Sequence, residues 1–148
     1  MRTFSTICLS VILTTVTTNN GFSACNVIGD KMYGDCSNVT INTKQRGPIK
    51  VKKFRNEAGI ISGATIFAGG HLELSGISEG TITVNKGGKL AITGQADSII
   101  SYGSVDIEGQ VGRLHNLGSA SIGGIVDSLS GDGKVTYRNG AVVGGVPH

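Results

Sequence analysis

The chain has 148 residues, a length that allows one domain. Its 24 glycines, with only two prolines and no three-residue period, exclude a collagen-like protein. A formal charge of +3 is too small to indicate nucleic-acid binding. Aromatic residues make up only 5% of the chain, which excludes an ordinary two-layer core filled by large rings. Frequent valine, isoleucine and threonine, punctuated by glycine, predict an all-β protein of many short strands.

The chain begins with a segment typical of an export signal. Arg2 provides a positive start, residues 4–16 are mainly apolar or hydroxylated, and a polar region ending in small residues follows. The apolar stretch is shorter than the ~20 residues that span a bilayer. We therefore expect residues 1–24 to be a bacterial secretion signal, and the mature protein to reside in the periplasm or at the cell surface.

Two cysteines, Cys25 and Cys36, follow this signal. An even pair in an exported chain predicts a disulfide that closes a short loop. The stretch "FSAC" also resembles a bacterial lipobox, in which Cys25 would carry a lipid and attach the protein to the membrane. No metal site or cofactor is predicted, because the three histidines, at positions 71, 115 and 148, lack the spacing of zinc ligands.

Residues 25–57 are expected to form an N-terminal cap with irregular coils. Within them lies a run of basic residues that contains no acid. Such a run can bind an acidic protein or an anionic component of the cell envelope. The alternative is that it forms a solvated cap or loop without a partner. The candidate binding residues are Lys44, Arg46, Lys50, Lys52, Lys53 and Arg55.

Residues 58–148 contain a repeat. The stretch "LELSG" at 72–76 corresponds to "LAITG" at 90–94, "VDIEG" at 105–109 and "ASIGG" at 120–124, and "VTY" at 135–137 closes the series. Further short apolar segments lie between these stretches. A unit of 15 to 18 residues cannot bury an apolar face alone, so it must stack on copies of itself.

The simplest construction is a single-stranded β-helix with one rung per repeat and like side chains stacked in inward columns. The inward spacings do not follow a strict hexapeptide, which favours the right-handed form, and the alternative fold is a β-sandwich. The expected columns include Ile92, Ile107, Ile122 and Tyr137, and also Val105, Ala120 and Val135.

Glycines fall in register with the same repeat. Gly94, Gly109 and Gly124 are expected to stack at one corner, where a positive φ favours glycine, and a second set at 103, 118 and 133 marks another corner. The final stretch "AVVGGVPH" is expected to cap the helix, because Pro147 has no N–H with which to extend a sheet.

Two families show similar coils. The stretch 63–94 resembles the coils of self-associating autotransporter passengers, and the stretch 104–126 resembles bactofilins. The resemblance covers residues 58 to 146, rests on glycine and aliphatic spacing, and implies a right-handed β-helix without intrinsic catalysis. The function of bactofilins does not carry over easily, since they are cytoplasmic and lack an export signal of this kind, and the large membrane barrel of autotransporters is absent from this sequence. Neither family supplies a site residue that can be transferred.

Many long β-helices cleave polysaccharides with carboxylates on one outer face, so polysaccharide cleavage is a third candidate function. Asp97 and Asp127 share a column two coils apart, with Arg113 nearby, a separation of ~10 Å. Solvated turn residues explain them more simply, and no enzymatic activity is expected. The sequence favours a protein-binding module, for instance a periplasmic immunity or inhibitor protein. The alternative is a self-associating structural or adhesive protein.

Overall fold

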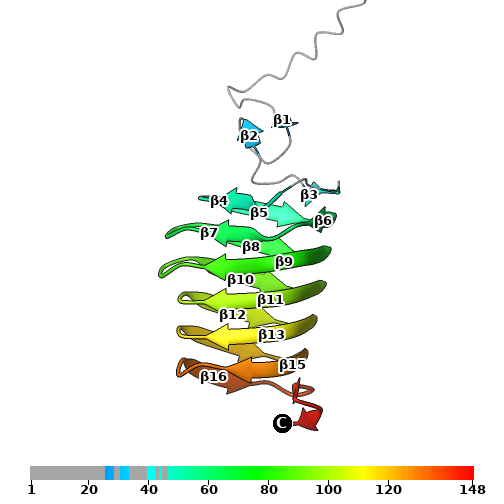
Figure 1. Cartoon of the computed structure of the whole chain (residues 1–148), viewed down its shortest axis with the longest axis vertical. Helices are drawn as coiled ribbons and strands as arrows, with labels where there is room; N and C mark the ends of the chain where they lie inside the picture. The colour runs from blue at the N-terminus through cyan, green and yellow to red at the C-terminus, as the bar shows by residue number, and fades with distance from the viewer. Residues whose placement is uncertain (1–25, 29–30, 34–39, 43, 45–46) are drawn as a thin grey trace, which may run out of the picture.

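The computed structural model describes residues 26–28, 31–33, 40–42, 44 and 47–148, and every regular element in them is a β-strand. From Thr40 to Val143 the strands coil around one axis and stack on one another in parallel (Figure 1). As the chain descends in Figure 1, the nearer strands run leftward and the farther strands run rightward, which is the sense of a right-handed coil. The predicted right-handed β-helix is therefore confirmed, with coils that take 15 to 18 residues each.

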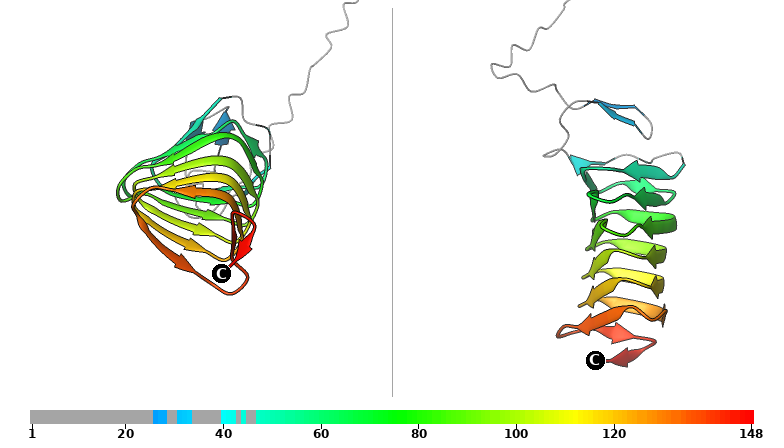
Figure 2. Two further views of the ribbon diagram at one scale, coloured as in Figure 1. Left: turned by 60° about the horizontal axis from the view of Figure 1, so that its bottom comes forward. Right: turned by 90° about the vertical axis from the view of Figure 1, so that its left-hand side faces the viewer.

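Two sheets enclose the interior. Figure 2 shows their stacked strands obliquely from one end of the rod and from the side. The seven-stranded sheet consists of β3 (Thr40–Ile41), β5 (Phe54–Glu57), β8 (His71–Leu74), β10 (Lys89–Ile92), β12 (Ser104–Ile107), β14 (Ser119–Ile122) and β16 (Lys134–Tyr137). The nine-stranded sheet consists of β4 (Ile49–Val51), β6 (Ile60–Ile61), β7 (Ala64–Ile66), β9 (Ile77–Val84), β11 (Gln95–Ser101), β13 (Gln110–Asn116), β15 (Ile125–Ser130), β17 (Val142–Val143) and β18 (Val146–Pro147).

The inward columns predicted from the repeat are present. Ile107 pairs with Ile92 on one side and with Ile122 on the other, and all three are buried. Tyr137 continues this column in register, but its side chain is 41% exposed because it lies in the last coil, where its ring stacks on that of His148. Since each aliphatic side chain packs on its equivalent one rung away, the interior is one continuous apolar core.

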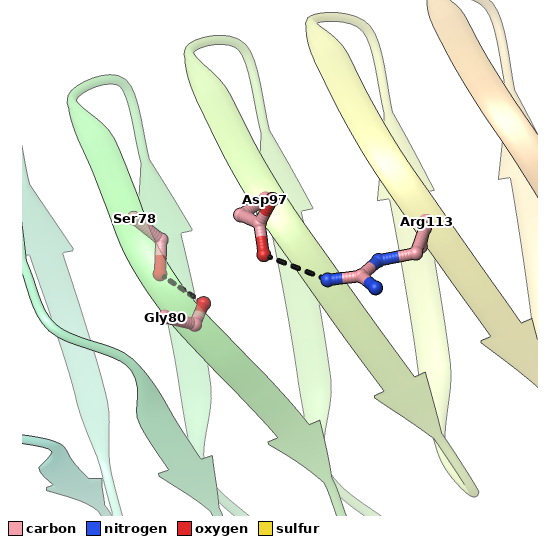
Figure 3. Close-up of polar contacts among 4 residues, drawn as sticks. All are labelled: Ser78, Gly80, Asp97 and Arg113. Atoms are coloured by element: carbon pink, nitrogen blue, oxygen red, sulfur yellow. Dashed lines mark hydrogen bonds and ion pairs between the residues drawn. The ribbon is translucent and has the colours of Figure 1, made fainter.

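The long strands of the nine-stranded sheet bend part-way along their length. In β11 the inward residues Ala96 and Ile99 are three apart, and β9 carries one more residue than β11 at the same place. The buried Ser78 hydroxyl donates to the carbonyl of Gly80 at 3.0 Å across this irregularity (Figure 3). A side chain on Gly80 would collide with the carbonyl of Ser62 in the previous coil, so the bend requires glycine.

The predicted glycine columns are present, but the prediction that a positive φ selects glycine in them is wrong. None of Gly94, Gly109 and Gly124 has a positive φ. A Cβ at each would instead overlap the carbonyl oxygen of the glycine one coil earlier, as for Gly124 over Gly109. The column at 103, 118 and 133 shows the same close approach. Close stacking of backbone on backbone therefore selects glycine at both corners.

The two ends of the β-helix differ in how their strands are paired. At the C-terminal end, β17 continues the nine-stranded sheet in parallel, and β18 folds back antiparallel to it through Gly144 and Gly145, both with positive φ. Positive φ at both turn residues suits a tight hairpin. At the other end, β3, β4 and β5 already belong to the two sheets, and β1 (Asn26–Ile28) and β2 (Lys31–Tyr33) form a separate antiparallel pair.

Candidate interaction surface

Consecutive turns from the nine-stranded to the seven-stranded sheet lie above one another, on the left of Figure 1. The first three are residues 52–53, 67–70 and 85–88. Backbone hydrogen bonds of 2.9 Å connect them in order. The N–H of Phe67 donates to the carbonyl of Val51, and the N–H of Asn85 donates to the carbonyl of Ile66. The turns are therefore held in a fixed stack, one coil apart.

Five lysines gather at this place, and we call them the basic corner: Lys50, Lys52, Lys53, Lys86 and Lys89. Each is exposed, and none forms an ion pair with a carboxylate of the residues that the structure describes. Lys52 places its Nζ 5.7 Å from the ring centre of Phe67 in the next turn, a cation–π contact. The five positive charges are therefore available to an anionic partner.

The sequence predicted three of these five lysines as binding residues and missed Lys86 and Lys89, which lie more than 30 positions further along the chain. Lys86 lies in the turn two coils below Lys52, and the N–H of Lys89 donates to the carbonyl of Gly70, one coil above. Aligning the turns of successive coils, rather than scanning for charge runs, is the signal that could have found them.

Arg55 does not belong to this surface. In β5 the side chains at positions 55 and 57 point inward, in register with Leu72 and Leu74 of the next coil. Arg55 is only 2% exposed and Glu57 is fully buried. The Arg55 Nε donates to Glu57 Oε1 at 2.6 Å, and a second contact joins its Nη2 to the same oxygen. The arginine of the predicted binding run is thus part of a buried ion pair.

Burial also acts on the ionisation of Glu57. Removal from water raises the pKa of this carboxyl above its ordinary value, although the Arg55 charge and hydrogen bond oppose the shift. Its Oε2 atom has no hydrogen-bond partner within the described part of the chain, which leaves half of the carboxylate without compensation.

The remaining predicted site residues lie elsewhere. Lys44 is exposed and pairs with Glu79, with 3.3 Å between Nζ and Oε2. Arg46, Cys25 and Cys36 lie outside the residues that the structure describes, so the predicted disulfide remains a prediction. The basic run of the sequence is therefore divided in space, and only its central lysines join the basic corner.

Of the two carboxylates considered for catalysis, Asp97 pairs with an arginine, whereas the exposed Asp127 forms no ion pair within the described residues. Arg113 donates from Nη2 to Oδ2 of Asp97 at 3.2 Å between adjacent rungs (Figure 3). Arg138 contacts Asp106 and also lies 2.7 Å from Glu108, after its side chain passes Gly123. The Arg113 pair joins adjacent coils and the Arg138 pairs span two coil steps. Each of these exposed pairs contributes ~0–1 kcal/mol to stability.

Histidines supply no metal centre in the described residues, where no group of three potential ligands occurs. His115 Nδ1 lies 2.9 Å from the Ser130 hydroxyl on the outer face, and the His71 ring packs edge-on against Phe54 with 5.2 Å between ring centres. These contacts connect neighbouring coils of the rod.

Three comparisons with known proteins found nothing similar: no family model matches the sequence, no curated protein matches it, and no solved structure matches the fold. Within the described residues, no helix has the length and apolarity to cross a membrane.

Proposed function

We propose that this protein is an exported, non-catalytic β-helix that binds another macromolecule, with the basic corner as its contact surface. One observation carries the proposal: five exposed lysines, in or beside turns distant in sequence, converge without carboxylate partners in the described chain. Like charges brought together repel one another, and an anionic partner relieves that repulsion.

The stacked coils suit this task because they hold the lysines on backbone that is hydrogen-bonded from rung to rung. Less conformational freedom is then lost at the backbone when a partner binds. The expected secretion signal would place the protein in the periplasm or at the cell surface, where an immunity or inhibitor protein blocks an effector. The resemblance to bactofilins and autotransporter passengers, whose coils have no catalysis of their own, agrees with a non-catalytic role.

Site-specific photo-crosslinking in the producing organism tests the proposal. A photoreactive residue at Lys53 or Lys86 should form an adduct with one and the same partner, whereas a residue at Ser121, on the outer face of the seven-stranded sheet, should not. Adducts from Ser121 alone, or no adduct from either lysine position, would contradict the proposal.

Self-association is the second candidate function, and one observation favours it. Strand β16 ends the seven-stranded sheet, whereas β18 folds over the equivalent edge of the nine-stranded sheet. An unpaired strand edge can accept a strand of a second copy. Light scattering separates the two candidates: a particle mass that grows into fibres with concentration supports self-association, and a constant mass supports partner binding.

A further inference from the structure

The basic corner continues downward into apolar side chains. Below the turn at 85–88, the turns at 102–103 and 117–118 present Tyr102 and Leu117, which are 48% and 42% exposed. The backbone N–H of Tyr102 donates to the carbonyl of Val84 at 2.8 Å, and the backbone N–H of Leu117 donates to the carbonyl of Ser101 at 2.7 Å. These bonds continue the same stack of turns, so Tyr102 and Leu117 occupy the same corner of the rod as Lys52.

We call this line of side chains the corner ridge: Lys52, Lys53, Phe67, Lys86, Lys89, Tyr102 and Leu117. It has a direction, because its lysines occupy the N-terminal coils and its large exposed apolar groups occupy the C-terminal coils. Four coil steps separate Lys52 from Leu117, a length of ~19 Å at the spacing of stacked strands. An extended segment of about six residues spans that length.

The lower end of the ridge argues against a uniformly negative partner. Asp132 is exposed in the turn at 131–133, which follows the turn of Leu117 by one coil. Lys134 follows it in the column of Lys89, so this end carries one carboxylate and one lysine. An anionic membrane or a polyanion laid along the ridge would gain no net attraction there. A suitable partner therefore carries its negative charge only where it faces the lysines.

We propose that the corner ridge binds an extended acidic segment of a protein partner, with apolar or aromatic side chains at the end that faces Tyr102 and Leu117. This inference rests on the proposed function and specifies the chemistry of its partner. Carboxylates would pair with the lysines, and the apolar end would cover Tyr102, since tyrosine combines a large rigid surface with a polar tip. Aromatic anchors of this kind dominate many interfaces.

Fluorescence anisotropy with defined peptides tests the inference. The probe is a labelled peptide of four glutamates, two glycines, a leucine and a phenylalanine, and its companion carries serines in place of the leucine and phenylalanine. We expect Tyr102→Ser with Leu117→Ser to weaken binding of the first peptide about tenfold, a loss of about 1.4 kcal/mol. The same variant should bind the serine peptide as the wild type does.

Two charge variants complete the design. Lys52→Glu with Lys86→Glu should weaken binding of both peptides about tenfold or more, because it replaces attraction by repulsion. Lys44→Glu with Arg113→Glu makes the same change in net charge at exposed positions outside the corner ridge, and should have a much smaller effect.

The outcomes separate this inference from the proposed function. Loss of binding in the lysine variant alone, with no effect at Tyr102 and Leu117, overturns the inference and leaves the basic corner as a binding surface. Equal losses in the lysine variant and its charge-matched control overturn both, because binding would then follow net charge. Binding to phosphatidylglycerol vesicles that equals binding to the first peptide also overturns the inference, in favour of a membrane.

Discussion

Arg55 and Glu57 form an ion pair inside the rod, at the two inward positions that Leu72 and Leu74 occupy one coil later. Two charges thus continue columns that are otherwise aliphatic up to Tyr137 in the last coil. Burying an ion pair costs desolvation that its Coulomb attraction only partly returns, whereas removing one partner leaves a charge in the interior. The stability of the first coils depends on both residues together.

A double substitution tests this coupling. Arg55→Leu alone should lower the free energy of unfolding by about 3–5 kcal/mol, because Glu57 remains buried without its cation. Arg55→Leu with Glu57→Leu should match the wild type or exceed it by about 1–4 kcal/mol, because it extends the leucine columns. Urea unfolding of the three proteins measures both differences. A double variant as unstable as the single one would contradict this account of the coil.

The same pair predicts a pH dependence. The pKa of Glu57 is raised in the folded protein, so above its ordinary value of 4.5 the folded state retains a proton that the unfolded chain loses. The contribution of Glu57 to stability is then fully present below that value and decreases as the pH rises through the folded pKa. We expect the stability difference between the wild type and the double-leucine variant to change over this range in favour of the variant. Thermal unfolding in buffers of increasing pH measures it, and a constant difference would refute the prediction.

Close stacking of the glycine corners makes a prediction at two adjacent residues. In Gly124→Ala the new methyl group overlaps the backbone carbonyl of Gly109, so we expect a loss of about 1–3 kcal/mol. In Gly123→Ala the nearest atom is Arg138 Nε at 3.3 Å, in a side chain that can move aside. That control should change stability by less than about 1 kcal/mol. Equal losses would show that backbone contact does not select glycine at position 124.

Two buried polar residues in one column should behave oppositely. The Ser101 hydroxyl has no hydrogen-bond partner among the described residues, so Ser101→Ala should be neutral or stabilising by up to about 1 kcal/mol. Asn116 donates to the carbonyl of Lys134 at 3.0 Å and accepts from the N–H of Gly118 at 3.2 Å. Asn116→Ala should therefore cost about 1–3 kcal/mol, and denaturant midpoints compare the two. A larger loss from Ser101→Ala than from Asn116→Ala would contradict these assignments.

The sequence predicted the columns of the C-terminal coils because those coils have constant length. Val105, for example, pairs with Ala120, 15 residues later. Between Leu72 and Leu90 the step is 18, because the turn at 85–88 has two more residues than the turn at 102–103 and β9 has one more residue than β11 at its bend. That change of length hid the alignment of Lys86 with Lys52. Strand β5 carries charged residues at inward positions, so its pattern did not indicate that Arg55 is buried.

The close approach of the two lysine turns is the claim on which the candidate surface depends. Mass spectrometry after treatment with a short amine-reactive cross-linker tests it most directly. Two coil steps place the turn of Lys52 and Lys53 ~10 Å from that of Lys86, so we expect cross-links between these turns and none from Lys53 to Lys134. A prominent cross-link from Lys53 to Lys134, with none to Lys86 or Lys89, would contradict the stacking of these turns and the surface built on it.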